Sequence, residues 1–188
     1  DSGSAVLDGF DIVKDYQAVR SRVGYMPGRF SLYPDLSVEE NLQFFAALFG
    51  VTVAESYSLV APIYKQIEPF RKRRAGKLSG GMKQKLALSC ALIHRPSVLL
   101  LDEPTTGVDA VSRCEFWDML AELRRHGLTI LVSTPYMDEA VRCDRVALCD
   151  EGGILKIDTP EGIVNDFDSV IYGVKAKSML SLLEKARL

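Results

Sequence analysis

Residues 78–85 read Leu-Ser-Gly-Gly-Met-Lys-Gln-Lys, and together with residues 99–104, Leu-Leu-Leu-Asp-Glu-Pro, they decide the fold class. In the first stretch, Ser79, Gly80 and Gly81 stand at the predicted start of a helix. Two glycines let the backbone approach a ligand closely, and the unpaired N–H groups of a helix start attract phosphate. Alone, this pattern is most often an ordinary glycine turn that caps a helix.

The second stretch ends a predicted buried strand in two adjacent carboxylates, Asp102 and Glu103. Carboxylates at the end of an apolar strand suit a magnesium ion and an attacking water. The alternative is a solvated strand end, where acidic residues are common.

The order and spacing of the two stretches resemble those of the nucleotide-binding domain of an ATP-binding cassette (ABC) transporter. Residues 104–109, Pro-Thr-Thr-Gly-Val-Asp, continue the family pattern and disfavour both simpler alternatives. The resemblance implies an α/β fold, a three-layer P-loop NTPase core with a helical subdomain. It also implies that the N-terminal strands and the Walker A phosphate loop are missing.

The expected organisation is a single ABC ATP-binding domain over residues 1–188. Its core would comprise residues 1–27 and 97–168, its helical subdomain residues 28–96, and its C-terminal extension residues 169–188.

The resemblance implies ATP and Mg²⁺ as cofactors and assigns a role to each matching residue. Ser79, Gly80, Gly81 and Gln84 belong to the signature loop and would bind nucleotide. Asp109 would be the aspartate of the D-loop, which in the family crosses the interface between two cassettes. Asp102 would hold Mg²⁺ through water, and Glu103 would orient and deprotonate the attacking water.

Three departures from the family pattern concern the chain's own nucleotide site. No G-x-x-x-x-G-K-[ST] motif occurs, so the chain looks truncated just after that loop and is expected to bind ATP weakly and to be inactive alone. Gly28 stands where the family has the glutamine of the Q-loop. Pro135 stands where it has the switch histidine, and proline offers neither such a side chain nor a backbone donor.

These departures suggest an asymmetric pair in which this chain's site is degenerate and its signature completes a site on a second ABC cassette, tandem or separate. The pattern most resembles the first cassette of bacterial exporters, some of which have two fused cassettes. The further partner would be a transmembrane permease subunit, which places the chain at the cytoplasmic face of the cell membrane. The apolar residues of 30–36 and of the helix face Leu42, Phe45 and Phe49 could receive that subunit or pack within the helical subdomain.

The sequence also fits two other interpretations. The chain could be a catalytically inactive cassette that acts as an interaction or regulatory module, or a soluble ABC ATPase that is not linked to transport. Gly28 and Pro135 favour the module, whereas Glu103 argues against complete loss of activity.

Composition and charge bear on the class of protein and on its expected partners. The chain has 188 residues, a net charge of −2 and 47% hydrophobic residues, which is typical of a globular domain and gives no basic signal, so no nucleic-acid partner is expected. No run approaches the roughly 18–20 apolar residues of a membrane span. The 4 cysteines have no CxxC spacing and are interpreted as thiols, not as a zinc site.

Apolar runs and periodicity predict the individual elements. The predicted strands are residues 4–7, 23–26, 98–101, 128–132 and 145–148. The predicted helices are a short helix or turn in 11–22, a helix from a Ser37–Glu40 capping box to Gly50, a helical stretch through about residue 70, and helices 80–95, 111–125 and 136–141. The alternation after residue 97 predicts a parallel sheet with helices on both faces.

Overall fold

The computed structural model describes residues 2–29 and 31–166. The chain divides into two compact units, Asp1–Arg142 and Cys143–Leu188. The helical subdomain boundaries at residues 28 and 96 stay a prediction. The expected extension, 169–188, and Phe30 lie outside the described residues.

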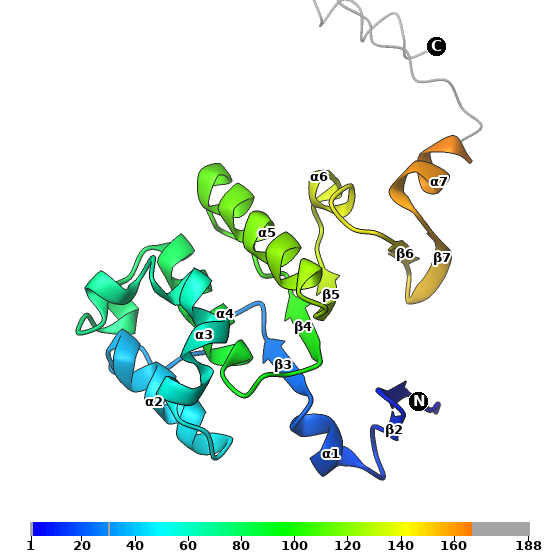
Figure 1. The fold of residues 1–188 in the computed structure, drawn as a ribbon. Coiled ribbons are helices and arrows are strands. Elements are labelled where there is room, and N and C mark those ends of the chain that lie inside the picture. Colours follow the sequence, from blue (N-terminus) through cyan, green and yellow to red (C-terminus); the bar gives the residue numbers. More distant parts are fainter. Residues whose placement is uncertain (1, 30, 167–188) are drawn as a thin grey trace, which may run out of the picture. The chain divides into compact units, whose positions relative to one another are not determined.

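The first unit is built on a parallel sheet of β3 (Val23–Met26), β4 (Val98–Asp102) and β5 (Thr129–Ser133). β4 lies in the middle, paired in parallel with both neighbours, as Figure 1 shows. Parallel pairing brings the carboxyl ends of the three strands to one edge. The predicted parallel α/β sheet is therefore confirmed for these three strands.

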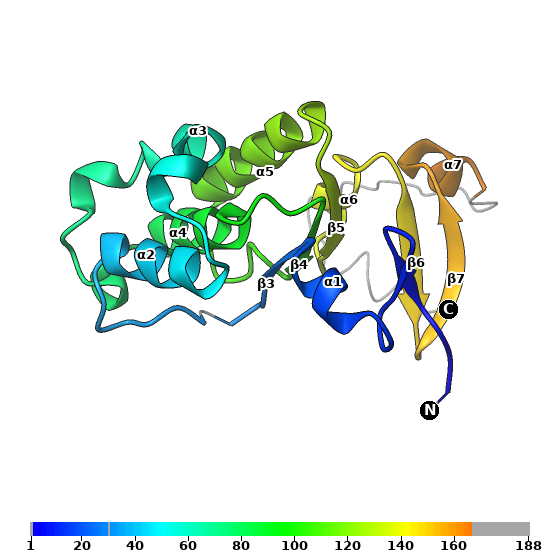
Figure 2. The ribbon, with the colours of Figure 1, turned by 60° about the horizontal axis from the view of Figure 1, so that its bottom comes forward.

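Two long helices pack beside this sheet, α4 (Gly80–Leu92) against β3 and α5 (Ala110–Arg125) against β5. They also contact each other, and they lie side by side in Figure 2. Gly24 makes the contact between β3 and α4 possible, because a Cβ there would lie 2.4 Å from the carbonyl oxygen of Ala91.

The two faces of the sheet differ in burial. Leu99 and Leu101 of β4 are buried, on the face that carries Gly24. On the other face, Tyr25 and Leu131 flank Leu100 in register and are 58% and 66% exposed. Helices were expected to bury both faces of the sheet. Within the described residues, only the face that carries Gly24 is buried in this way.

The helices between β3 and β4 begin at side-chain caps. α2 (Val38–Leu48) starts at the predicted capping box, in which Ser37 and Glu40 exchange hydrogen bonds, and α3 (Val53–Tyr64) starts at a second box formed by Thr52 and Glu55. Two 3₁₀ turns, η1 (Glu68–Phe70) and η2 (Ala75–Lys77), lead to α4.

The apolar residues of this region differ in burial. Leu42 is buried, whereas Tyr33 and Phe44, whose rings meet edge to face at 4.7 Å, are 46% and 40% exposed. Whether they receive a membrane subunit or pack within the helical subdomain stays a prediction.

The ends of the first unit are short elements. β1 (Val6–Leu7) and β2 (Phe10–Asp11) form an antiparallel hairpin, followed by α1 (Tyr16–Arg20). At the other end, α6 (Met137–Ala140) follows β5 and corresponds to the predicted helix 136–141.

The second unit contains β6 (Val146–Asp150), β7 (Gly153–Asp158) and α7 (Pro160–Asn165). The prediction of residues 145–148 as the next parallel strand is wrong, because β6 pairs antiparallel with β7, as Figure 2 shows. The cause is local: Glu151 and Gly152 between the strands have φ of 44° and 80°, a conformation that closes tight hairpins. Neither this turn nor β7 was predicted from the sequence.

Candidate active site

The two carboxylates lie where β4 ends. Asp102 is the last residue of β4 and is paired in register with Ser133, the last residue of β5. The Ser133 hydroxyl donates to Oδ1 of Asp102 at 2.6 Å. The backbone N–H of Glu103 donates to the carbonyl oxygen of Ser133 at 3.0 Å and to its hydroxyl at 3.1 Å. The strand ends thus form one polar cluster that presents two exposed carboxylates.

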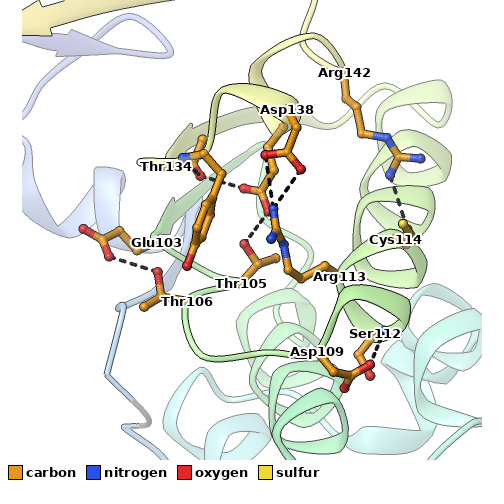
Figure 3. Close-up of polar contacts among 12 residues, drawn as sticks. Glu103, Thr105, Thr106, Asp109, Ser112, Arg113, Cys114, Thr134, Asp138 and Arg142 are labelled. Carbon is orange, nitrogen blue, oxygen red and sulfur yellow. Dashed lines mark hydrogen bonds and ion pairs between the residues drawn. The ribbon is translucent and has the colours of Figure 1, made fainter. Parts of the chain in front are cut away.

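Glu103 has an unusual backbone conformation. Its φ is 42°, in the left-handed region that costs a residue with a side chain on the order of 1–3 kcal/mol. Its carboxylate accepts a hydrogen bond from the Thr106 hydroxyl at 3.0 Å, as shown in Figure 3. Hydrogen bonds therefore hold Glu103 both at its backbone N–H and at its carboxylate.

The side-chain atoms of this cluster that could bind a metal suit a magnesium ion. All are oxygens, and the Ser133 hydroxyl binds Oδ1 of Asp102. Mg²⁺ bound to a nucleotide takes one or two protein carboxylates, with phosphates and water as its other ligands. Across residues 2–29 and 31–166 no group of three or more His, Cys, Asp or Glu side chains is arranged to hold a metal.

Gly28 lies beside the residues that carry the carboxylates. A Cβ built there would be 3.0 Å from the carbonyl oxygen of Asp102 and 3.5 Å from Cβ of Glu103. Glycine places no side chain at this position. Pro135 is exposed two residues beyond Ser133, so this departure from the family pattern follows β5, whereas Gly28 follows β3 of the same sheet.

The predicted signature residues lie at the start of α4. Ser79 is its N-cap, with its hydroxyl accepting from the N–H of Met82 at 3.4 Å. Ser79 and Gly80 are exposed, and the nearest atom to a Cβ built on Gly80 is the Gly107 carbonyl oxygen at 3.8 Å. Gln84 is partly exposed one turn further along the helix.

Gly81 has a different environment from Gly80. It is buried, and a Cβ there would lie 2.5 Å from the Ser112 hydroxyl oxygen and 2.7 Å from Cβ of Ser112. Glycine at residue 81 therefore allows α4 to pack against α5, a requirement that is independent of phosphate binding.

Asp109 is the N-cap of α5. Its Oδ1 accepts from the N–H of Ser112 at 3.0 Å, and this bond holds the pKa of Asp109 below its usual range. Since Ser112 also lies against Gly81, the start of α4 and the N-cap of α5 form a second cluster.

Glu139, to which no role was assigned from the sequence, is the centre of a buried network. Its side chain is 2% exposed and accepts hydrogen bonds from Thr105 at 2.6 Å, Thr134 at 2.6 Å and Nε of Arg113 at 3.1 Å. Arg113 also pairs with Asp138 at 3.1 Å (Figure 3). The network joins the loop after the carboxylates, the first turn of α5 and the loop after β5.

The protonation of Glu139 follows from these contacts. Burial alone raises the pKa of Glu139, but the hydrogen bonds from Thr105 and Thr134 outweigh it, so the pKa lies below its usual range. The only hint in the sequence was that Asp138 and Glu139 match the family pattern. A matching position does not show that its carboxylate is buried.

Comparison with known proteins shows the family to which the chain belongs. The family model described as ABC transporter matches residues 1–106. The chain therefore belongs to the ABC transporter family and is an ATP-binding domain of that family. None of the helices in the described residues is long and apolar enough to cross a bilayer.

Two individual relatives show which transporter proteins the chain is similar to. The probable multidrug ABC transporter ATP-binding protein YbhF of Escherichia coli (strain K12) is 48% identical over 165 residues, which are 87% of this chain and 28% of that protein. Nod factor export ATP-binding protein I of Burkholderia orbicola (strain AU 1054) is 39% identical over 167 residues, 87% of this chain and 55% of that protein. The chain thus spans between about a quarter and about half of these relatives.

A solved structure shares the fold. CbiO1 from Clostridium perfringens, described as part of the ABC transporter complex cbiONQ, superposes with a TM-score of 0.74 at 26% identity, covering 86% of this chain and 67% of that chain. The ABC cassette fold, predicted from two short motifs, is confirmed.

Proposed function

We propose that this chain is the ATP-binding part of an export transporter and acts at the cytoplasmic face of the membrane with a permease subunit. The family match and the relatives named for multidrug transport and Nod factor export support this proposal. ATP would bind between two cassettes, and its binding and hydrolysis would drive transport by the membrane partner.

The carboxylate cluster would carry the chemistry. Mg²⁺, when bound with the nucleotide, neutralises charge on the phosphates. Asp102 would hold it through water, while Glu103 would orient the attacking water and accept its proton. The bond from Thr106 to the Glu103 carboxylate supports this role, because it fixes the direction of the base.

The position of Gly28 is the observation that carries the rest of the proposal. It lies against Asp102 and Glu103 but has no side chain to place at the nucleotide, and Pro135 removes a second polar side chain from the same edge. The chain's own site would therefore hydrolyse ATP slowly. Its exposed signature residues, Ser79 and Gly80, would complete a competent site on the second cassette.

Gly80→Asp tests this division of labour in the full natural assembly, with Gly80→Asn as the neutral control of equal size. Residue 80 has space for a side chain, and an acidic residue in the first turn of a helix is favourable, so the fold tolerates Asp. A charge near the phosphates is expected to lower ATP turnover at least about tenfold relative to Asn. Equal turnover of both variants would contradict a signature that serves a working site.

Gly28 and Pro135 also favour a second candidate, an inactive module that supplies only a signature to its partner. Glu103→Gln separates the two, because it removes the base of this chain's own site and leaves the signature intact. The module predicts unchanged turnover in Glu103→Gln and lost turnover in Gly80→Asp. Slow hydrolysis at the chain's own site predicts that both substitutions lower turnover.

A further inference from the structure

Ser133 contacts both residues that carry the proposed chemistry. Its hydroxyl donates to Asp102 at 2.6 Å and accepts from the N–H of Glu103 at 3.1 Å. A hydroxyl can do both at once, since it has one hydrogen to donate and lone pairs to accept. Alanine can do neither, whereas threonine can do both.

The second of these bonds matters because the Glu103 backbone is strained. With φ at 42°, this residue holds its conformation only if the surroundings compensate for the strain. Its N–H has two acceptors on Ser133, the hydroxyl and the carbonyl oxygen, and its carboxylate has a donor in Thr106. The hydroxyl of Ser133 is the contact that also binds Asp102, so it couples the two carboxylate residues.

Ser133 is itself held in place. It pairs with Asp102 in the β4–β5 register, and the next residue, Thr134, donates to the buried Glu139 at 2.6 Å. The hydroxyl therefore presents a fixed point between the two carboxylates before any nucleotide arrives.

We propose that Ser133 is a positioning residue for ATP hydrolysis at this chain's own site, fixing one oxygen of Asp102 and the backbone of Glu103. The inference rests on the proposed function, in which these carboxylates serve magnesium and water. Ser133 acts through them and has no assigned contact with the nucleotide.

The test compares Ser133→Ala with Ser133→Thr in the full natural assembly, and Thr129→Ala is the matched control. Thr129 has an exposed side chain at the other end of the same strand, so its loss removes a hydroxyl from β5 without touching the carboxylates. Two quantities are measured: steady-state ATP turnover, and amide hydrogen exchange over the end of β4 without nucleotide or magnesium.

In Ser133→Ala, kcat from this site is expected to fall about tenfold to a hundredfold, with KM for ATP changed less than about twofold. To isolate this site, turnover is measured in a background where the partner site is silenced. Exchange of the Glu103 amide is expected to rise about fivefold, the effect of losing one hydrogen bond. Ser133→Thr and Thr129→Ala should resemble the wild type in both measurements.

Unchanged exchange at Glu103 in Ser133→Ala overturns the positioning role whatever happens to turnover. Faster exchange with unchanged kcat, where Glu103→Gln does lower kcat, also overturns it, because the carboxylates then work without the serine. If Glu103→Gln itself leaves kcat unchanged, the proposed hydrolysis at this site fails, and with it the catalytic meaning of Ser133. The exchange result still decides whether Ser133 fixes the Glu103 backbone.

Discussion

Replacing Gly81 by alanine should destabilise the domain, although the same change at Gly80 should not. The two glycines are adjacent in the first turn of α4, so alanine gains similar helix propensity at both positions, up to about 1 kcal/mol. The surroundings differ. The new methyl group would have its nearest neighbour at 3.8 Å at residue 80, but at 2.5 Å and 2.7 Å from two Ser112 atoms at residue 81.

The size of the effect follows from these distances. Carbon and oxygen atoms in contact lie about 3.5–4.0 Å apart, so the methyl group at residue 81 would require a shift of roughly 1 Å between α4 and α5. Forcing extra atoms into a packed contact costs about 1–3 kcal/mol. We expect Gly81→Ala to lower the free energy of unfolding by about 1–2 kcal/mol relative to Gly80→Ala.

A double-mutant cycle with Ser112→Gly, measured by urea unfolding of the full natural protein, identifies the cause. Removing the Ser112 side chain leaves its Cα, at 4.0 Å, as the nearest atom to the new methyl group. Gly81→Ala should then cost about 1–2 kcal/mol less in the Ser112→Gly background than in the wild type. Additive effects, or equal stability of the two alanine variants, would refute the steric explanation.

The remaining predictions concern the buried network and the hairpin. Glu139→Ala removes the acceptor of the buried Thr105 hydroxyl and one partner each of Thr134 and Arg113, and should lower the free energy of unfolding by about 3 kcal/mol. The control Asp138→Ala, at a side chain that is 75% exposed, should cost less than about 1 kcal/mol in the same urea titration. The pKa of Glu139 is lowered from 4.5, so its contribution is complete above that pH and is lost as pH falls through the lower folded value. The stability difference between wild type and Glu139→Ala should therefore shrink below pH 4.5, and a constant difference would contradict a buried carboxylate. Gly152→Ala places a side chain at φ 80° and should destabilise the hairpin by about 1 kcal/mol, seen as faster amide exchange in β6 and β7, while the neighbouring Gly153→Ala, with ordinary φ, should change it less.

Much of the first unit was predictable because its signals are local in sequence. The capping box at Ser37, the apolar run of β4 and the glycines at the start of α4 each lie within a few residues and correspond to observed elements. The hairpin could also have been predicted. Glu151 is an uncommon residue at positive φ, but Gly152 and Gly153 beside it are residues that hairpin turns favour.

The site was predictable in its residues but less so in their contacts. Asp102 and Glu103 were found from their place at a strand end, because any parallel strand presents its last residues at that edge. Ser133 and Glu139 were not found, because each acts through partners about thirty residues away in sequence. Such contacts depend on strand register and helix packing, and no short pattern encodes them.

The contacts around Glu103 bear on whether this chain is a working ATPase or an inactive module. A side chain at φ 42° costs on the order of 1–3 kcal/mol, and a residue without a task could relax to ordinary geometry. Instead, two acceptors on Ser133 and a donor from Thr106 hold it in place. In the proposed function, Gly28 and Pro135 lack side chains that would act on the nucleotide, but the hydrogen bonds that support the two carboxylate residues are present. This pattern favours a site that is slowed over a site that has been abandoned, and it makes Glu103→Gln the decisive substitution for the chain's own turnover.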